Sequence, residues 1–114
     1  MRRLPALLAA LAACGASAAP AGGAVAVDVT LQPNKIHEEC ARLEPGQSRR
    51  YHWRSSVPVD FNIHYHSGKD VHYPVKRDAM RGDGGTFTAK SAEDYCWMWS
   101  ARDKPAKVEG GIEK

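Results

Sequence analysis

Long apolar runs are missing from this sequence of 114 residues. No stretch reaches the roughly 18 consecutive apolar residues that cross a bilayer as a helix, so no transmembrane helix is expected. A strong charge bias is also missing: without Arg2 and Arg3, 14 basic residues face 13 acidic ones. Domains that bind nucleic acid usually carry a clear basic excess, so nucleic acid is not an expected partner. The length suits one domain.

Recognisable motifs of catalysis are absent as well. The sequence contains no G-x-S-x-G elbow and no glycine-rich phosphate loop. The residues of the acidic pairs Glu38-Glu39 and Glu93-Asp94 are sequence neighbours, so their side chains point apart in an extended chain. Such a pair cannot act together as general acid and general base. We therefore expect a binding module rather than an enzyme.

The first residues have the layout of a secretory signal peptide. Met1-Arg2-Arg3 gives a positive start, residues 4–13 are apolar, and small residues follow. Two cleavage sites compete. Leu11-Ala12-Ala13-Cys14 resembles the lipobox of bacterial lipoproteins, whereas Ala16-Ser17-Ala18 offers ordinary cleavage after Ala18.

The lipobox is the favoured alternative, with Cys14 as the lipidated residue. The expected organisation is then a signal peptide at 1–13, a flexible Ala/Gly tether at 14–24 and one folded domain at 25–114. Gly15 after the cysteine resembles the pattern that routes bacterial lipoproteins to the outer membrane. We expect an exported periplasmic protein, held at that membrane by a lipid anchor.

Cysteine is scarce, with three residues in the chain. Cys14 is either lipidated or removed, so Cys40 and Cys96 remain as a pair in an oxidising compartment. We predict a disulfide between them. The alternative, a pair of thiolate metal ligands, requires these thiols to stay reduced.

Helical periodicity is also lacking after residue 24, while alternation with a period of two recurs between turn signals. This pattern predicts an all-β protein, an antiparallel β-sandwich of about six to eight short strands. The predicted strands are 25–31, 49–55, 59–66, 71–76, 86–89 and 95–100, with Gly82-Asp83-Gly84-Gly85 as one of the breaks between them.

The hairpin between residues 59 and 76 is the most informative part of this pattern. Burying the apolar residues of both strands on one face pairs Tyr65 with Val71 and leaves residues 67–69 as a three-residue loop. The outer face then places His64 opposite His72, and His66 opposite Asp70. A slip of one residue would instead place His72 opposite Tyr65 and dissolve this group.

Three imidazoles and a carboxylate on one patch predict a transition-metal site. His64, His66 and His72 would be the ligands, with Asp70 in support. Nitrogen and oxygen donors favour copper first and zinc second. The alternative is a solvated polar face without a metal. His37 and Met98 are possible additional ligands, although each has a simpler structural explanation.

Several short motifs from residue 29 onward resemble the GOLD (Golgi dynamics) domain, a β-sandwich. They are Cys40 before Leu-Glu-Pro-Gly-Gln at 43–47, Val-Asp-Phe-Asn-Ile at 59–63, Gly-Lys at 68–69, Gly-Thr-Phe at 85–87 and Tyr-Cys at 95–96. The resemblance implies recognition of a protein or lipid, and family members often join two such cysteines. The coiled coil and transmembrane helix of the cargo receptors in this family are missing. An envelope protein or small ligand is therefore the expected partner in the alternative without metal.

Overall fold

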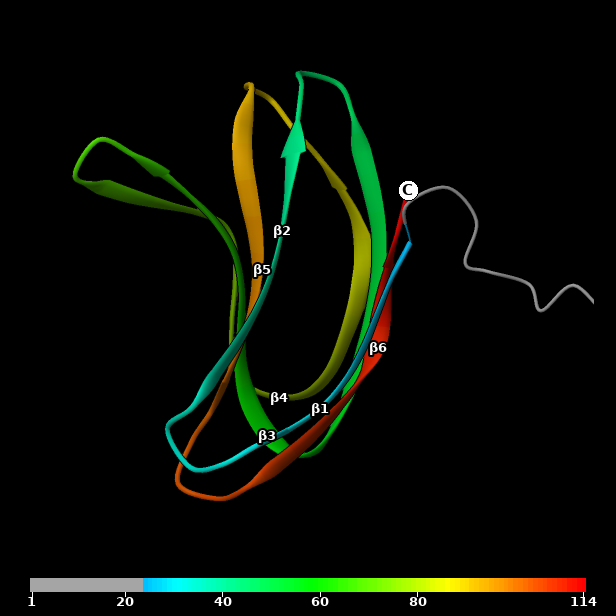
Figure 1. Cartoon of the computed structure of the whole chain (residues 1–114), viewed down its shortest axis with the longest axis vertical. Helices are drawn as coiled ribbons and strands as arrows, with labels where there is room; N and C mark the ends of the chain where they lie inside the picture. The colour runs from blue at the N-terminus through cyan, green and yellow to red at the C-terminus, as the bar shows by residue number, and fades with distance from the viewer. Residues whose placement is uncertain (1–23) are drawn as a thin grey trace, which may run out of the picture.

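A computed structural model describes residues 24–114, which form six β-strands (Figure 1). The strands are β1 (Val25–Leu31), β2 (Ile36–Leu43), β3 (Ser48–Ser67), β4 (Asp70–Thr88), β5 (Glu93–Ala101) and β6 (Ala106–Glu113). All pairings are antiparallel, which confirms the predicted all-β class. The predicted signal peptide, the tether as far as residue 23 and Cys14 lie outside the described residues. The described part of the chain contains no helix that could cross a membrane.

The long strand β3 organises one continuous sheet, ordered β1-β6-β3-β5-β2, with β4 also paired to β3. The first part of β3, Arg50 to Ser55, pairs with β6, and the later part, Val59 to His64, pairs with β5. Between these parts the register with β4 shifts, since Arg54 lies opposite Gly82 but Val59 lies opposite Met80. Extra residues on one strand bend it. The sheet therefore curls into the half-barrel of Figure 1.

Two predicted breaks are continuous strand in the structure. The predicted strands 49–55 and 59–66 are parts of β3, and the glycine-rich residues 82–85 lie inside β4. These glycines allow close approach of backbones rather than a turn. A Cβ at Gly82 would lie 3.0 Å from the carbonyl oxygen of Trp53, and one at Gly84 would lie 3.2 Å from that of Tyr51.

Side chains that alternate along the strands fill the concave side of the sheet. The largest fully buried ones come mainly from β3 and β5, namely Trp97, Trp99, Tyr95, Phe61, Ile63 and Val59. Phe61 contacts Trp99 and Trp53 with ring centroids 5.4 and 5.2 Å apart. The core therefore uses the period of two that the sequence shows. It also fixes which side chains of β3 and β5 face outward.

The tip of the β3–β4 hairpin departs from the predicted register. Ser67 pairs with Asp70, so the turn has two residues, Gly68 and Lys69. The φ of Gly68 is 62°, as a glycine at the first central position of such a turn allows. Tyr65 then lies opposite His72, where Val71 was expected. The predicted register is wrong by one residue at the tip because a two-residue turn closes the hairpin.

A bulge follows this turn along β4. The pair Tyr65 and His72 is followed by the pair Ile63 and Val75, so Tyr73 and Pro74 lie opposite the single residue His64. Proline cannot donate a ladder hydrogen bond and is tolerated at such an irregularity. The bulge returns Val75 to the face of Ile63, and Val75 packs against the core.

The predicted disulfide between Cys40 and Cys96 is confirmed. These residues lie directly opposite one another on β2 and β5, with Cα atoms 4.0 Å apart. β2 was not recognised as a strand from its sequence, and neither was β6. The disulfide closes a sequence separation of 56 residues and holds β2 on the sheet.

Candidate functional site

The disulfide and four side chains beside it form a group of six residues on the outer face of the sheet. Pairing across β3, β5 and β2 sets them in two rows, since residues directly opposite one another share a face. We call this group the outer-face cluster. Its rows are His64, Cys96 and Cys40, and beside them Asn62, Met98 and Glu38.

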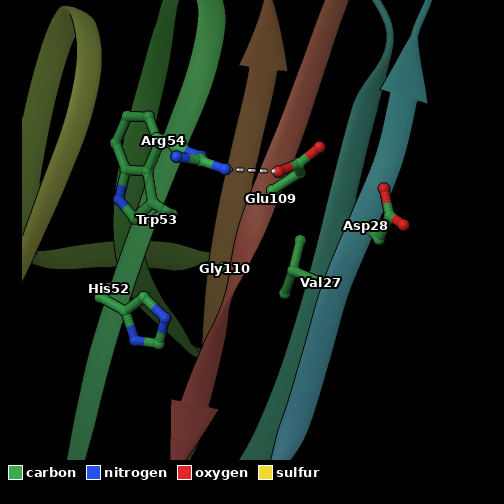
Figure 2. Close-up of a pocket in the computed structure, with 7 residues that line it drawn as sticks. All are labelled: Val27, Asp28, His52, Trp53, Arg54, Glu109 and Gly110. Carbon is green, nitrogen blue, oxygen red and sulfur yellow. Dashed lines mark hydrogen bonds and ion pairs between the residues drawn. The ribbon is translucent and has the colours of Figure 1, made fainter.

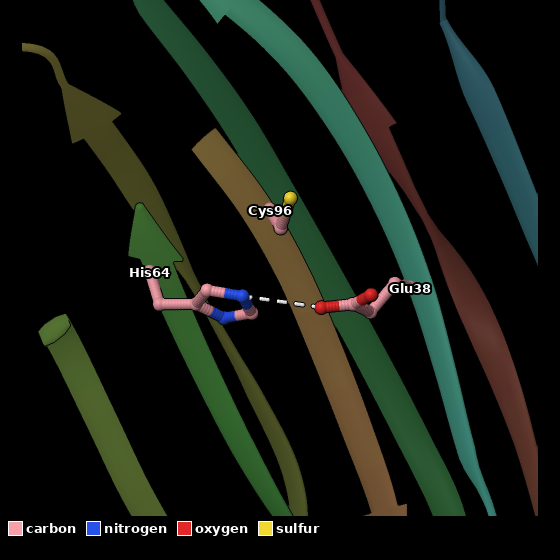
Figure 3. A group of neighbouring side chains, drawn as sticks. All are labelled: Glu38, His64 and Cys96. Atoms are coloured by element: carbon pink, nitrogen blue, oxygen red, sulfur yellow. Dashed lines mark ion pairs between the residues drawn. The ribbon is translucent and has the colours of Figure 1, made fainter. Parts of the chain in front are cut away.

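His64 is the centre of the outer-face cluster. Its Nδ1 atom lies 2.7 Å from Oδ1 of Asn62, and its Nε2 atom lies 3.1 Å from Oε1 of Glu38. His64 is 4% exposed and Asn62 is 8% exposed, although both lie on the outer face. Figure 3 shows the His64 ring reaching from β3 toward Glu38 on β2, with Cys96 beside the line between them. Both ring nitrogens therefore have an oxygen neighbour.

Burial controls the charge of His64. Loss of water around the ring lowers the pKa of His64, the Glu38 carboxylate works in the opposite direction, and His66 lowers the pKa further. Because burial is the largest influence, the neutral ring is favoured compared with a histidine in water. A neutral imidazole carries one N–H group, which can serve only one of its two oxygen neighbours.

The histidines predicted as metal ligands are only partly brought together. His64 and His66 share the outer face with ring centroids 5.3 Å apart. His72 instead stacks on Tyr65, with centroids 4.9 Å apart, and Asp70 pairs with Ser67. The two-residue turn moves His72 and Asp70 to the opposite face, so the predicted group of four is not assembled. Binding of copper or zinc by the remaining pair stays a prediction.

The two possible additional ligands lie on different faces. His37 faces the concave side, where its Nε2 atom lies 2.9 Å from Oε1 of Glu39 and its ring lies 6.0 Å from that of Trp99. It therefore cannot join His64. Met98 belongs to the outer-face cluster, between Asn62 and Glu38.

Sequence reasoning missed Glu38 as a neighbour of His64, and it placed Asn62 on the face of His64 without assigning it a contact. A signal for Glu38 was present, because it precedes Cys40 by two residues and must share its face once β2 is extended. Among the described residues, Glu38, His64 and Cys96 are the group whose ligand atoms all lie within 4.8 Å of one another. Cys96 is bonded to Cys40 here, so it offers no thiolate.

A second feature is a shallow hollow of about 590 Å³ on the outer face of β1, β6 and β3, shown in Figure 2. Arg54 crosses it and donates from Nη2 to Oε2 of Glu109 at 3.1 Å. Hydrogen bonds from Arg54 and Lys107 lower the pKa of Glu109. Arg54 and Glu109, two of the charged residues that line this hollow, therefore pair with each other.

The third feature is an exposed apolar surface on the β3–β4 hairpin, whose tip extends away from the rest of the sheet in Figure 1. Tyr73 is 48% exposed and Val71 is 37% exposed. Val71 lies opposite His66, and Nζ of Lys76 lies 5.5 Å from the centre of the Tyr73 ring. We call His66, Val71, Tyr73 and Lys76 the hairpin patch. It results from the same turn that displaced His72.

Comparisons with known proteins add a fold but no family. The sequence matches no protein-family model and no curated protein. The structure is similar to PliG of Aeromonas hydrophila, a periplasmic lysozyme inhibitor of g-type lysozyme. The TM-score is 0.57 with 7% sequence identity, over 79% of this chain and 84% of that chain. The GOLD resemblance finds no support in these comparisons and stays a prediction. The chain therefore shares a small β fold with PliG.

Proposed function

We propose that this chain is an exported, non-catalytic module of the cell envelope that binds another protein. The observation that carries this proposal is the hairpin patch, where Tyr73 and Val71 are exposed on a projecting strand. Tyrosine is enriched among the residues that dominate binding energy at protein interfaces. Among the strands of residues 24–114, β4 pairs only with β3, so its other edge is also open to a partner.

We infer the class of partner from the shared fold. PliG is described as an inhibitor of g-type lysozyme, and the likeness covers most of both chains. The proposed partner is therefore an enzyme of the lysozyme type that hydrolyses the cell wall. Binding of this kind needs complementary surfaces and no reacting groups on the inhibitor.

Two observations support export to an oxidising compartment. The described residues contain a disulfide, and such bonds are rare in proteins of the cytosol. The sequence also begins with the layout of a signal peptide. An anchor at Cys14 in the outer membrane remains part of the proposal. Cys14→Ser should release the protein from the membrane fraction, and retention in that fraction would reject the anchor.

The test of protein binding is inhibition of lysozyme. The full chain carrying Cys14→Ser is added to a g-type lysozyme, and lysis of cell-wall suspensions is followed by turbidity. We expect inhibition, weakened at least tenfold by Tyr73→Ala. Arg54→Ala is the matched control, because Arg54 is exposed but lies on the part of β3 that pairs with β6.

Two results would contradict the proposal. One is the absence of both inhibition and binding with lysozymes of the g type and of the other animal and bacterial types. The other is equal inhibition by the Tyr73→Ala variant and by the parent, which would remove the hairpin patch from the interface.

A further inference from the structure

Both ring nitrogens of His64 have an oxygen neighbour in the outer-face cluster. Nδ1 lies 2.7 Å from Oδ1 of Asn62, and Nε2 lies 3.1 Å from Oε1 of Glu38. In the tautomer with its proton on Nδ1, that N–H group donates to Asn62, and the lone pair of the neutral ring is on Nε2. Nε2 and Oε1 are then two neighbouring donor atoms for a cation.

The disulfide sulfurs lie beside His64 and Glu38. Sγ of Cys96 lies within 4.8 Å of the ligand atoms of both His64 and Glu38, and Cys40 lies directly opposite Cys96. Ligand atoms of a tetrahedral zinc ion are about 3.3 to 3.8 Å apart, given bonds of about 2.0 to 2.3 Å. Binding of zinc would therefore widen the 3.1 Å between Nε2 and Oε1 slightly and bring the sulfur closer to both atoms. The disulfide itself keeps both sulfurs from acting as thiolates.

We propose that reduction of the disulfide converts the outer-face cluster into a zinc site. Its ligands are the thiolates of Cys40 and Cys96, Nε2 of His64 and Oε1 of Glu38. Two sulfurs, one nitrogen and one oxygen make a donor set that suits a four-coordinate zinc ion. Asn62 is the positioning residue of the proposed site, because its Oδ1 lies 2.7 Å from Nδ1 and accepts from the Nδ1–H group in the tautomer whose lone pair is on Nε2.

Reduction of the disulfide requires a two-electron reductant, and the proposal names a reduced protein dithiol in this role. The disulfide takes up two electrons and two protons and becomes two thiols, while the reductant becomes a disulfide. Zinc binding then releases the two thiol protons. Cys40 is exposed on β2, which pairs only with β5, so an attacking thiolate can reach it.

The outer-face cluster and the hairpin patch share no residue, although the His64 ring lies 5.3 Å from that of His66 and 5.8 Å from that of Tyr73. Zinc binding is measured without lysozyme, so this inference does not depend on lysozyme binding. The experiment uses the full chain with Cys14→Ser, so that only Cys40 and Cys96 provide sulfur. Oxidised protein and protein reduced with a phosphine compete for Zn²⁺ with a chromogenic chelator. We expect one equivalent of Zn²⁺ in the reduced protein, bound at least 100-fold more tightly than in the oxidised protein.

Variants separate this site from other ways of binding zinc. In the reduced protein, His64→Ala and Glu38→Gln should each weaken Zn²⁺ binding at least tenfold. His52→Ala is the control and should leave it unchanged, since His52 lies on the first part of β3, opposite Gly84 and Gly111 and away from β5. Cobalt(II) in place of zinc should give the charge-transfer absorption of thiolate ligands.

Circular dichroism measures whether the reduced protein without metal is still folded. If the reduced protein without metal is unfolded, Zn²⁺ should restore the β spectrum in the parent but not in His64→Ala. Equal Zn²⁺ affinity of the oxidised and reduced proteins would overturn the proposal. Equal affinity of reduced His64→Ala and the reduced parent would also overturn it, because two thiols alone would then account for the binding.

Discussion

Among single residues, Tyr51 shows most directly how the position of a side chain in the fold changes its pKa. Tyr51 is buried at 6% exposure, and a Cβ at Gly85 would lie only 3.5 Å from its hydroxyl oxygen. Burial raises the pKa of Tyr51, the nearby Asp83 carboxylate raises it further, and Arg77 acts in the opposite direction. The folded protein therefore holds this phenol neutral more strongly than the unfolded chain does.

This difference predicts loss of stability in alkali. The contribution of Tyr51 is complete below its unfolded pKa of 10.0 and is lost as the pH rises through the higher folded pKa. The free energy of unfolding, measured with urea between pH 8 and pH 11.5, should fall above pH 10. Tyr51→Phe should flatten this fall, while Tyr73→Phe, at an exposed tyrosine, should not. Equal slopes for Tyr51→Phe and the parent would contradict the assignment.

Residues also show where sequence reasoning succeeds. Cysteine count and compartment identified the disulfide, and the period of two placed Phe61 and Ile63 in the core. The sequence also placed Asn62, His64 and His66 on one face. It could not show that Glu38 lies beside His64, because that requires the order of three strands.

At the scale of elements, the central difficulty is register. A choice between a two-residue and a three-residue turn at Gly68 moves His72 from one face to the other. The bulge at Tyr73 and Pro74 then reverses the shift for Val75. The alternation of apolar and polar residues within one strand does not reveal such changes, since each strand keeps its own pattern when its pairing shifts by a residue. β6 was missed because Gly110 and Gly111 are typical of a turn.

Gly110 allows β6 to approach β3 closely. A Cβ at this position would lie 2.1 Å from the carbonyl oxygen of His52 and 2.6 Å from Cα of Trp53. We predict that Gly110→Ala costs about 3 kcal/mol or more of unfolding free energy, because backbone must move.

Gly111→Ala is the matched control for that measurement. Its Cβ would meet the carbonyl oxygen of Val25 at 3.3 Å and the His52 ring at 3.5 Å, which small movements can relieve. We expect a loss of about 1 kcal/mol or less. Denaturant unfolding of both variants is the measurement. A smaller loss for Gly110→Ala than for Gly111→Ala would refute the close approach of β6 and β3.

At the scale of the whole molecule, the disulfide ties the edge strand β2 to the core. On the loop-entropy model, a closed loop with a sequence separation of 56 residues destabilises the unfolded chain by about 4 kcal/mol. Cys40→Ser/Cys96→Ser should therefore lower Tm by roughly 15 to 30 °C, measured by calorimetry with metal chelated. An unchanged Tm would show that β2 is held by its ladder alone.

The overall curvature could not be predicted from the sequence. The strands and their alternation indicated an all-β protein, but the curl depends on the change of partner along β3 near residues 55–58. The sequence of these residues does not indicate that β6 pairs with one part of β3 and β5 with the other.

The pairing of β1 with β6 has a consequence for biogenesis. Val25 at one end of the described chain pairs with Ile112 at the other. β1 therefore has no ladder partner until β6 has left the ribosome or the export channel, and pairing between segments so far apart in the sequence forms slowly. A product truncated before Ala106 would leave both β1 and the first part of β3 without their neighbour. Completion of the sheet thus waits for β6.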